Sequence, residues 1–172
     1  MSQLQIAPVL ETERLVLRPH VAGDFDKLAE IFATDRSRFI GGPLDRKSVW
    51  RGFAGDVGQW VLLGFGAWAI EVRENGAYVG QIALNFPEHF PERELGWTVW
   101  QEFEGRGYAM EAALRAREFA YRDLGWPTAV SYIAPENVRS IKLAERMGAS
   151  VDPDAASPDG DVSLVYRHPA KI

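Results

Sequence analysis

The residues best placed to do chemistry form a glycine turn within Glu104–Ala112, and a helical pattern follows it at once. At the start of a helix several backbone N–H groups lack a partner, and they point outward beside the positive end of the helix dipole. Because glycine has no Cβ, Gly105 and Gly107 would let an anion approach this backbone closely. The turn therefore predicts a binding site for a phosphate or pyrophosphate group.

The spacing of the glycines limits which phosphate ligand the turn could hold. The dinucleotide fingerprint G-x-G-x-x-G requires a third glycine where this chain has Met110. The Walker loop requires G-K-[ST] after a longer spacing, and that pattern is also missing. A G-x-G turn also occurs as an ordinary helix start without a ligand, so the flanking sequence must decide between the two interpretations.

The side chains on either side of the turn repeat with different periods. From Glu94 to Trp100 they alternate every second residue, which predicts a strand. From Tyr108 to Leu124 apolar residues return at helical spacing. The opposite side of this helix carries charged residues in pairs four positions apart, a spacing that supports helices. These residues are Glu111, Arg115, Glu118 and Arg122.

The hexapeptide at residues 104–109, E-G-R-G-Y-A, resembles the acetyl-CoA loop Q/R-x-x-G-x-G/A of the GNAT N-acetyltransferase superfamily. The longer string G-R-G-Y-A-x-E-A is similar to the branch that includes the RimJ and RimL ribosomal-protein acetyltransferases. Glu104 stands where the family usually has Gln or Arg, so the resemblance implies a backbone cradle without that side-chain contact. The residues implied in cofactor binding are Gly105, Arg106, Gly107, Tyr108, Ala109 and Met110.

A second motif lies further along the chain, where N-V-R-S at residues 137–140 precedes A-E-R-M-G. This resembles the GNAT element N-x-x-S…E-K-x-G-F. Asn137 also suits an ordinary helix N-cap, and Ser140 could simply bond back to its own helix. The resemblance instead places Asn137 at the cofactor and the Ser140 hydroxyl near the CoA sulfur, as a candidate general acid. Many relatives use a tyrosine four residues later, where this chain has Ala144.

Amide formation from a thioester needs a neutral amine, a stabilised oxyanion and a leaving thiolate. A lysine-like amine is neutral only about one time in a thousand at pH 7, and an α-amine roughly one time in ten, so a base assists the attack. Glu94 is the candidate base, because it shares a strand face with Gly96 and Thr98 and several family members carry a carboxylate near this place. The alternative is a surface glutamate paired with Arg93 or another cation.

The same resemblance implies a path for the pantetheine arm of CoA. The arm would lie between the strand that contains Glu94 and the strand expected at Ala129–Ile133. A backbone N–H of this strand could also stabilise the oxyanion. The residues implied are Trp97, Thr98 and Val99.

Length and composition predict one domain over residues 1–172. With 172 residues, of which 47% are hydrophobic, the chain can bury a substantial core. A formal net charge of −5 with no basic run disfavours nucleic acid or anionic lipid as a partner. No apolar run approaches the roughly 20 residues of a membrane span, and Met1–Val9 has no signal-peptide features. We therefore expect a cytoplasmic protein.

The counts of cysteine and histidine narrow the chemistry. There is no cysteine, which excludes a cysteinyl acyl-enzyme and favours direct transfer between bound substrates. The three histidines, His20, His89 and His168, are far apart in the sequence, so no metal site is expected.

The remaining patterns predict how the chain is built. Asp24 would cap the first helix, and Trp50 and Phe53 would either cover the sheet or roof an acceptor pocket. A strand-helix-strand crossover would make the strands before and after the long helix parallel. The expected strands are Thr12–Pro19, Ala67–Arg73, Ala77–Asn85, Arg93–Trp100, Ala129–Ile133, Ala149–Val151 and Val162–His168, and the expected helices are Phe25–Ala33, Arg46–Trp60, Tyr108–Leu124 and Val138–Met147.

Together these features predict an α/β protein with a single GNAT domain. Its twisted sheet would be mixed and mostly antiparallel, with about six to seven strands and about four flanking helices. The implied activity is transfer of an acetyl group from acetyl-CoA to a primary amine, on a peptide N-terminus or on a small molecule such as an antibiotic. A non-catalytic acyl-CoA sensor is the alternative from another functional class. The sequence is compatible with a monomer or a homodimer.

Overall fold

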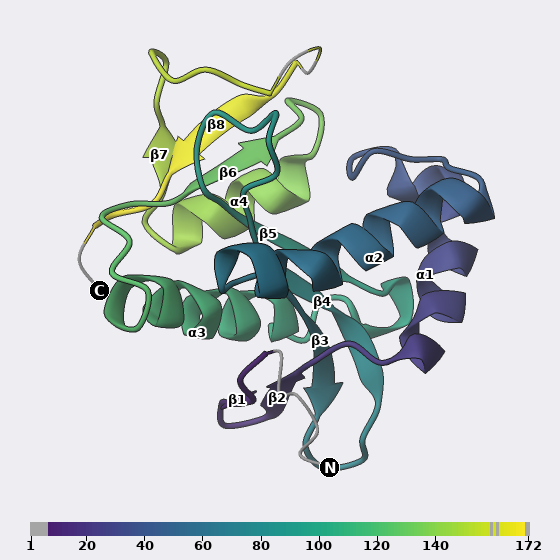
Figure 1. The fold of residues 1–172 in the computed structure, drawn as a ribbon. Coiled ribbons are helices and arrows are strands. Elements are labelled where there is room, and N and C mark those ends of the chain that lie inside the picture. The colour runs from purple at the N-terminus through teal and green to yellow at the C-terminus, as the bar shows by residue number, and fades with distance from the viewer. Residues whose placement is uncertain (1–6, 159, 161, 171–172) are drawn as a thin grey trace.

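A computed structural model describes residues 7–158, 160 and 162–170, so the first six residues of the Met1–Val9 segment lie outside it (Figure 1). Strands within these residues form one sheet in the order β1-β2-β3-β4-β5-β6-β8-β7. Every neighbouring pair is antiparallel except β5 and β6. The strands are β1 Leu10–Glu11, β2 Leu15–Arg18, β3 Ala67–Val72, β4 Tyr78–Asn85, β5 Glu94–Val99, β6 Val130–Ile133, β7 Ser150–Val151 and β8 Leu164–Arg167.

The expected mixed and mostly antiparallel sheet is confirmed, but it has eight strands where six to seven were expected. The extra strand is β1, two residues long, in which Leu10 pairs with Leu17. A segment this short shows no alternation that a sequence pattern could reveal. The other expected strands are present with ends that differ by a few residues.

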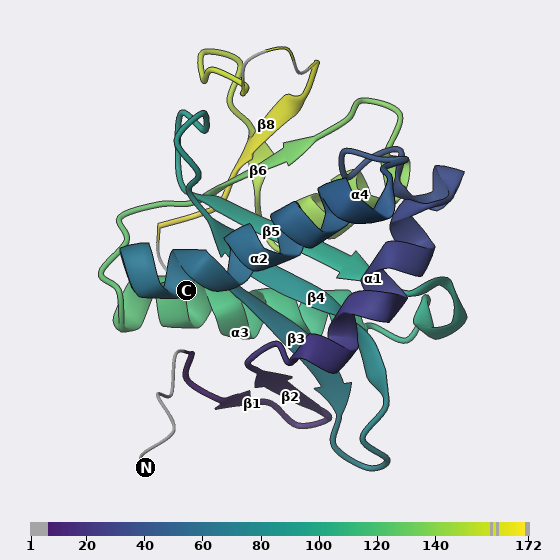
Figure 2. The same cartoon turned by 45° about the vertical axis from the view of Figure 1, so that its right-hand side comes forward.

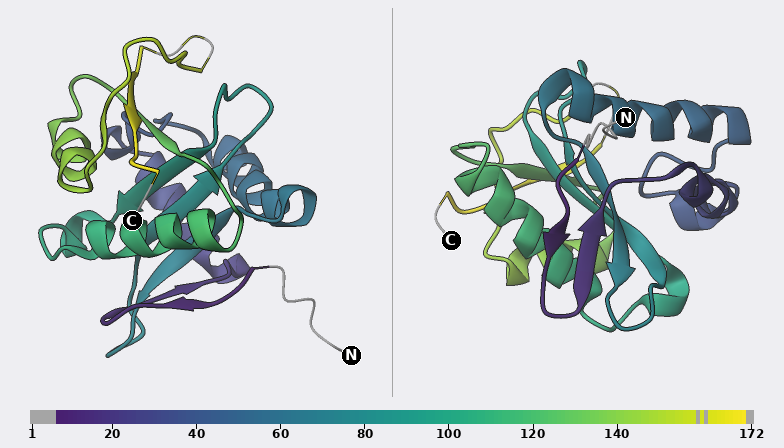
Figure 3. Two further views of the ribbon diagram at one scale, coloured as in Figure 1. Left: turned by 90° about the vertical axis from the view of Figure 1, so that its left-hand side faces the viewer. Right: turned by 60° about the horizontal axis from the view of Figure 1, so that its bottom comes forward.

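Four α-helices cover the two faces of the sheet. Helices α3 and α4 lie on one face, and α1 and α2 lie on the other (Figure 3, left). Figure 2 shows α2 crossing the sheet with α1 beside it. In the described part of the chain no helix is long and apolar enough to cross a membrane. The helices are α1 Phe25–Phe32, α2 Arg46–Leu63, α3 Tyr108–Arg122 and α4 Val138–Arg146.

Three hydrophobic clusters of described residues hold these layers together. The smallest joins α4 to β6 and β8 and consists of Ile133, Ala144, Ala149 and Tyr166. The other two position the elements around the glycine turn and beneath α2. The larger one lies between the sheet and α3, where a face of small alanines allows the helix to approach buried strand residues such as Leu84 and Leu95 closely. The smaller one, here named the roof cluster, joins α1 to α2 and ends on Trp100. The roof cluster consists of Phe25, Leu28, Ala29, Val49, Phe53 and Trp100.

Helix α2 begins and ends with standard capping residues. The Asp45 side chain accepts a hydrogen bond from the Ser48 amide, and Gly64 ends the helix with a left-handed φ of 78°. Between these ends lie Gly52, Gly55 and Gly58, each of which lowers helix propensity by about 1 kcal/mol relative to alanine. The helix therefore depends on the roof cluster for much of its stability.

Asp24 occupies the N-cap position of α1, as expected, but its side chain makes no capping hydrogen bond to this helix. Asp24 has helical backbone angles and closes a short 3-10 helix, Ala22–Asp24, that precedes α1. Its buried carboxylate accepts two hydrogen bonds from the Arg18 guanidinium, each 2.9 Å long, and one from the Val21 amide at 3.0 Å. The carboxylate is thus committed to an ion pair with β2, which ties the start of α1 to the sheet.

This ion pair predicts how stability depends on pH. Burial opposes the charge of Asp24, but hydrogen bonds from His20, Arg18 and Val21 outweigh it and hold the pKa of Asp24 well below its usual range. Asp24→Asn should lower the free energy of unfolding by about 2 kcal/mol at pH 7. A carboxylate with a lowered pKa stabilises the fold above about pH 4, its unfolded value, and less as the pH falls further.

Urea unfolding at pH 7, 5, 4 and 3 measures the effect, and the two stability curves should converge below about pH 4. Asp26→Asn is the matched control, because the Asp26 side chain is 78% exposed and should change stability by less than about 0.5 kcal/mol. If the loss of unfolding free energy in Asp24→Asn stayed constant down to pH 3, the electrostatic explanation would be contradicted.

Candidate active site

The predicted order of strand, glycine turn and helix is confirmed. Strand β5 ends at Val99, and α3 begins at Tyr108 directly after Gly107. Gly105 and Gly107 have φ angles of 75° and 79°, in the left-handed region that glycine adopts without strain. No described side chain caps the start of α3. The first backbone N–H groups of the helix are therefore available to a ligand.

The glutamate in the first turn of α3 fastens this turn to the beginning of the domain. Glu111 Oε1 accepts hydrogen bonds from the Thr12 hydroxyl at 2.6 Å and the Arg14 amide at 2.8 Å, and Oε2 accepts from Arg14 Nε at 2.7 Å. Arg14 Nη1 also donates to the Arg106 carbonyl at 2.9 Å. Burial opposes the charge of Glu111, yet these contacts keep the pKa of Glu111 below its usual value.

This arrangement corrects one expected helix pair. Glu111 does not pair with Arg115, because Arg14, 97 residues earlier in the chain, takes its carboxylate. Arg115 instead forms an ion pair with Glu118 at 3.4 Å. The expected ion pair of Glu118 with Arg122 is present at 2.5 Å. The spacing rule for helices considers only local partners, so it could not reveal this contact between Glu111 and Arg14.

Glu104, the residue that departs from the family pattern, lies between two arginines. Its carboxylate forms ion pairs with Arg36, from the short 3-10 helix after α1, and with Arg139 of α4 at 2.7 Å. The glutamate therefore links three segments around the glycine turn. It also gathers two positive charges beside a turn that favours an anion.

The second motif is placed on α4, which faces β5. Asn137 caps the helix as expected, since its Oδ1 accepts a hydrogen bond from the Ser140 amide at 3.3 Å. The Ser140 hydroxyl oxygen accepts a hydrogen bond from Trp97 Nε1 at 3.2 Å. Ser140 therefore contacts the central strand, across the space between α4 and β5.

The parallel strands β5 and β6 form a fork. They pair in register only at Glu94 and Val130, and beyond this point they diverge. The Ser131 hydroxyl donates to the Leu95 carbonyl at 2.6 Å, which satisfies a backbone acceptor where the ladder ends. The expected parallel crossover is thus confirmed, and the strands separate beside Trp97.

A buried histidine, His168, contacts the fork through Ser131. Because the Ser131 hydroxyl gives its proton to Leu95, it accepts from His168 Nε2 at 2.9 Å, and His168 Nδ1 accepts from Arg117 at 3.3 Å. Burial lowers the pKa of His168 to about 4, and the positive charge of Arg117 acts in the same direction. The imidazole is therefore neutral near pH 7.

Sequence reasoning gave no role to Arg117 or His168. The available signal was an arginine on the alanine face of a helix, between Ala113 and Ala120, where only a partnered charge can be buried.

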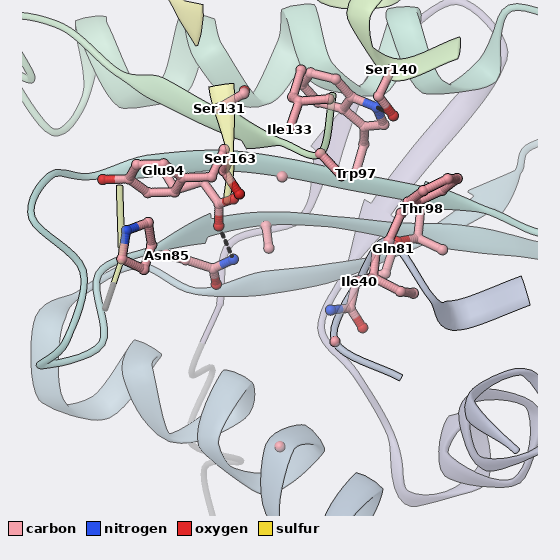
Figure 4. A pocket seen from close by; sticks show the side chains of 18 of the residues that line it. Ile40, Gln81, Asn85, Glu94, Trp97, Thr98, Ser131, Ile133, Ser140 and Ser163 are labelled. Atoms are coloured by element: carbon pink, nitrogen blue, oxygen red, sulfur yellow. Dashed lines mark hydrogen bonds between the residues drawn. The ribbon is translucent and has the colours of Figure 1, made fainter. Parts of the chain in front are cut away.

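A cavity of about 590 Å³ extends from the fork to the space beneath α1 and α2 (Figure 4). The structure brings five of the predicted site residues to its walls, whereas Val99 and the glycine turn are not part of its lining. Phe53 lines the cavity and also belongs to the roof cluster, but Trp50 is 49% exposed and does not line it. The five residues are Glu94, Trp97, Thr98, Asn137 and Ser140.

Glu94 lies on the floor of this cavity. Its carboxylate accepts a hydrogen bond from Asn85 Nδ2 at 3.0 Å, and the two residues are direct cross-strand partners (Figure 4). The neighbouring Arg93 guanidinium lies over the rings of Phe86 and Trp126. The Glu94 carboxylate thus borders the cavity beside the Asn85 amide. Among the described residues there is no group of three or more histidines and carboxylates suited to a metal ion.

The histidine behind the fork should cause a loss of stability in acid. The unfolded chain binds a proton at His168 near pH 6.5, but the folded protein resists this until about pH 4. His168 therefore makes folding less favourable as the pH falls between these values, by up to about 3 kcal/mol. In His168→Gln, whose amide keeps a donor and an acceptor, this contribution to the pH slope should vanish.

Chemical unfolding from pH 7 to pH 4 compares the slopes. His89→Gln is the control, since His89 is exposed and its replacement should leave the slope close to that of the wild type. Equal slopes in His168→Gln and the wild type would contradict a buried neutral imidazole.

Known proteins of similar sequence and structure can now be compared with this geometry. The family model described as "Acetyltransferase (GNAT) domain" matches residues 14–150. A crystal structure of an acetyltransferase from Agrobacterium tumefaciens strain C58 is similar, with 44% identity, coverage of 95% of both chains and a TM-score of 0.91. An uncharacterized N-acetyltransferase of Bacillus subtilis, YnaD, is 27% identical over 79 residues.

The chain spans about half the length of the curated relatives it matches, 45% in the case of YnaD. RimL, a ribosomal alpha-N-protein acetyltransferase, has a TM-score of 0.71 but only 15% identity, so this likeness shows the fold alone. Since the family model matches well over half of the chain, this protein belongs to the GNAT acetyltransferases, a family of acyltransferases that take their acetyl group from acetyl-CoA.

Proposed function

We propose that the protein transfers the acetyl group of acetyl-CoA to a primary amine by direct attack while both substrates are bound. The observation that carries this proposal is the continuous cavity. At one side it contains the fork with Trp97 and Ser140, and at the other side a chamber with the Glu94 carboxylate. One molecule can thus enter through the fork while a second approaches it from beneath α2.

The chain offers a fitting site for acetyl-CoA. Backbone N–H groups over residues 105–110 would hold the pyrophosphate, and the left-handed Gly107 keeps a side chain away from it. A Cβ built on Gly107 would lie 3.3 Å from Arg14 Nη2, so the space above the turn is already narrow. The pantetheine arm would follow the backbone of Trp97, Thr98 and Val99 in the fork, and Asn137 would hold the loop beside it.

Glu94 and Ser140 would serve different steps. Glu94 would take a proton from the incoming ammonium group, directly or through water, so that the neutral amine attacks the thioester carbon. A backbone N–H of β5 would stabilise the oxygen as it becomes negative. Because Ser140 Oγ accepts its hydrogen bond from Trp97, its own proton is free to be given to the departing thiolate. Because the chain has no cysteine, it offers no thiol that could carry the acetyl group covalently, which supports a sequential mechanism.

The acceptor and the setting are further parts of this proposal. A RimJ/RimL-like enzyme would modify a protein N-terminus, whereas a small-molecule enzyme would take a free amine, and a sensor would bind acetyl-CoA without turnover. We infer a cytoplasmic enzyme that acts as a monomer or a homodimer. Acetyl-CoA turnover with a panel of small amines and peptides separates these alternatives, and absence of turnover with all of them would favour the sensor.

The cofactor prediction can be tested by stability. Acetyl-CoA at 100 times its Kd should stabilise the fold by about 2.7 kcal/mol, and free CoA should also stabilise it, whereas NAD and ATP should not. Gly107→Ala should remove most of this effect by placing a methyl group at the turn. Gly125→Ala is the matched control, because Gly125 has a similar φ of 67° but lies just beyond the other end of α3.

Thermal unfolding of the three proteins with and without ligand measures both effects. An unchanged melting temperature of the wild type at millimolar acetyl-CoA would contradict the proposed function. An equal loss of the acetyl-CoA effect in both variants would assign the effect to backbone strain.

The role of Glu94 predicts a specific pH profile. Glu94→Gln should lower kcat/KM about 10²- to 10⁴-fold at pH 7, as is typical for loss of a general base. The deficit should shrink as the pH rises, because the amine then loses its proton without help. Steady-state rates from pH 6 to 10 provide the measurement, with the exposed Glu88→Gln as the control. A deficit independent of pH would mean that Glu94 binds or positions the acceptor and does not act as a base.

A further inference from the structure

We propose that Asp56, on α2, is a second acceptor-binding carboxylate, and that the chamber takes a linear amine with a second protonated nitrogen at its far end. The inference rests on the proposed function and specifies its acceptor. The sequence motifs do not include Asp56. Its role follows from the geometry of the cavity.

Two carboxylates in the cavity lining each accept a hydrogen bond from an amide side chain of β4. Asp56 Oδ2 accepts a hydrogen bond from Gln81 Nε2 at 3.0 Å, and Glu94 Oε2 accepts one from Asn85 Nδ2 at the same distance. Gln81 and Asn85 are four residues apart on β4, so their side chains lie on the same face of the sheet. The Cα atoms of Gln81 and Asn85 are therefore about 13 Å apart along the strand.

The floor between the pairs is flat and apolar. It consists of Ala83 and Gly96, which are direct cross-strand partners and carry no long side chain. Apolar side chains from the roof face the same space, among them Ile40, Val49 and Phe53. Figure 4 shows Asn85 and Glu94 at one end of this floor and Gln81 with Thr98 at the other. This shape suits an extended aliphatic chain.

The polar groups at the Asp56 end require a hydrogen-bond donor. At the other end, Asn85 Oδ1 already accepts a hydrogen bond from Gln59 Nε2 at 3.4 Å. Gln81 Oε1 is buried and has no hydrogen-bond partner among the described residues. The one arginine in the described lining, Arg38, is 54% exposed and pairs with Asp35 at 2.7 Å. An ammonium group would supply both the donors and the countercharge.

The electrostatics of Asp56 support a ligand at this end. Burial raises the pKa of Asp56 to about 6, and the hydrogen bond from Gln81 and the nearby His20 lower it only in part. Because this pKa lies above the usual value, the charged form of Asp56 disfavours folding at neutral pH. A carboxylate that costs stability in the free protein is typical of a binding residue.

The spacing specifies the ligand class. If the carboxylates follow the spacing of Gln81 and Asn85 and each hydrogen bond takes about 3 Å at its end, the two nitrogens would lie roughly 7 Å apart. That distance corresponds to an α,ω-diamine with an aliphatic chain of roughly four to six carbons. The reacting nitrogen would lie at Glu94, the proposed base, and the distal ammonium group would lie at Asp56.

The first experiment compares 1,5-diaminopentane with pentylamine, which has the same chain but one nitrogen. The wild type should prefer the diamine in kcat/KM by about 10- to 100-fold, the range expected for one charge-assisted contact. In Asp56→Asn this preference should fall to within about twofold, through loss of diamine activity with little change for pentylamine. The control is Asp26→Asn, which changes an exposed aspartate of α1 and should keep the preference for the diamine.

A second measurement tests the site without catalysis and separates binding from a structural role. The diamine should raise the melting temperature of the wild type but not that of Asp56→Asn, and the unliganded variant should be at least as stable as the wild type at pH 7. Acetylation of both amines at equal rates, or peptide acetylation without diamine binding, would overturn the inference and leave the proposed function standing. Diamine binding without any acetyl transfer would support the site and overturn the proposed function.

Discussion

The constraint on which the structure depends is the single registered pair between β5 and β6. A helix crossover makes these strands parallel, and after Glu94 and Val130 their backbones separate. Separated strands expose backbone groups that must find partners, and the Ser131 hydroxyl provides one for Leu95. The fork is therefore an opening in an otherwise continuous sheet, and the proposed function places the thioester there.

The other parts of the site are held at set positions relative to this opening. Arg14 and Thr12 fasten the glycine turn through Glu111, and Glu104 joins that turn to α4 through Arg139. The glycine turn is thus connected by ion pairs both to the start of the domain and to α4. Such contacts provide the precise positioning that substrate alignment requires, whatever their net contribution to stability.

Patterns that repeat locally predicted most of the fold. Alternation in β5 and helical spacing in α3 depend on neighbours in sequence, so both elements were identified with nearly correct ends. Contacts between distant residues were not predictable in this way. Glu111 meets Arg14 and Asp56 meets Gln81 only because the sheet brings them together. Glu94 was proposed from its strand face and Ser140 from a family motif, whereas Asp56 belongs to no recognised pattern.

The separation of the larger hydrophobic cluster from the roof cluster has a consequence for how such an enzyme can diversify. The cradle and the fork belong to the layer of β5 and α3, whereas Asp56 and Phe53 lie in the part of α2 that packs on the roof cluster, before Trp60 joins the larger cluster. Mutations in α2 can therefore reshape the acceptor chamber while the core that holds the cofactor site remains intact. Lineages that share one acetyl donor could thus acquire different acceptors by replacing residues of a single helix.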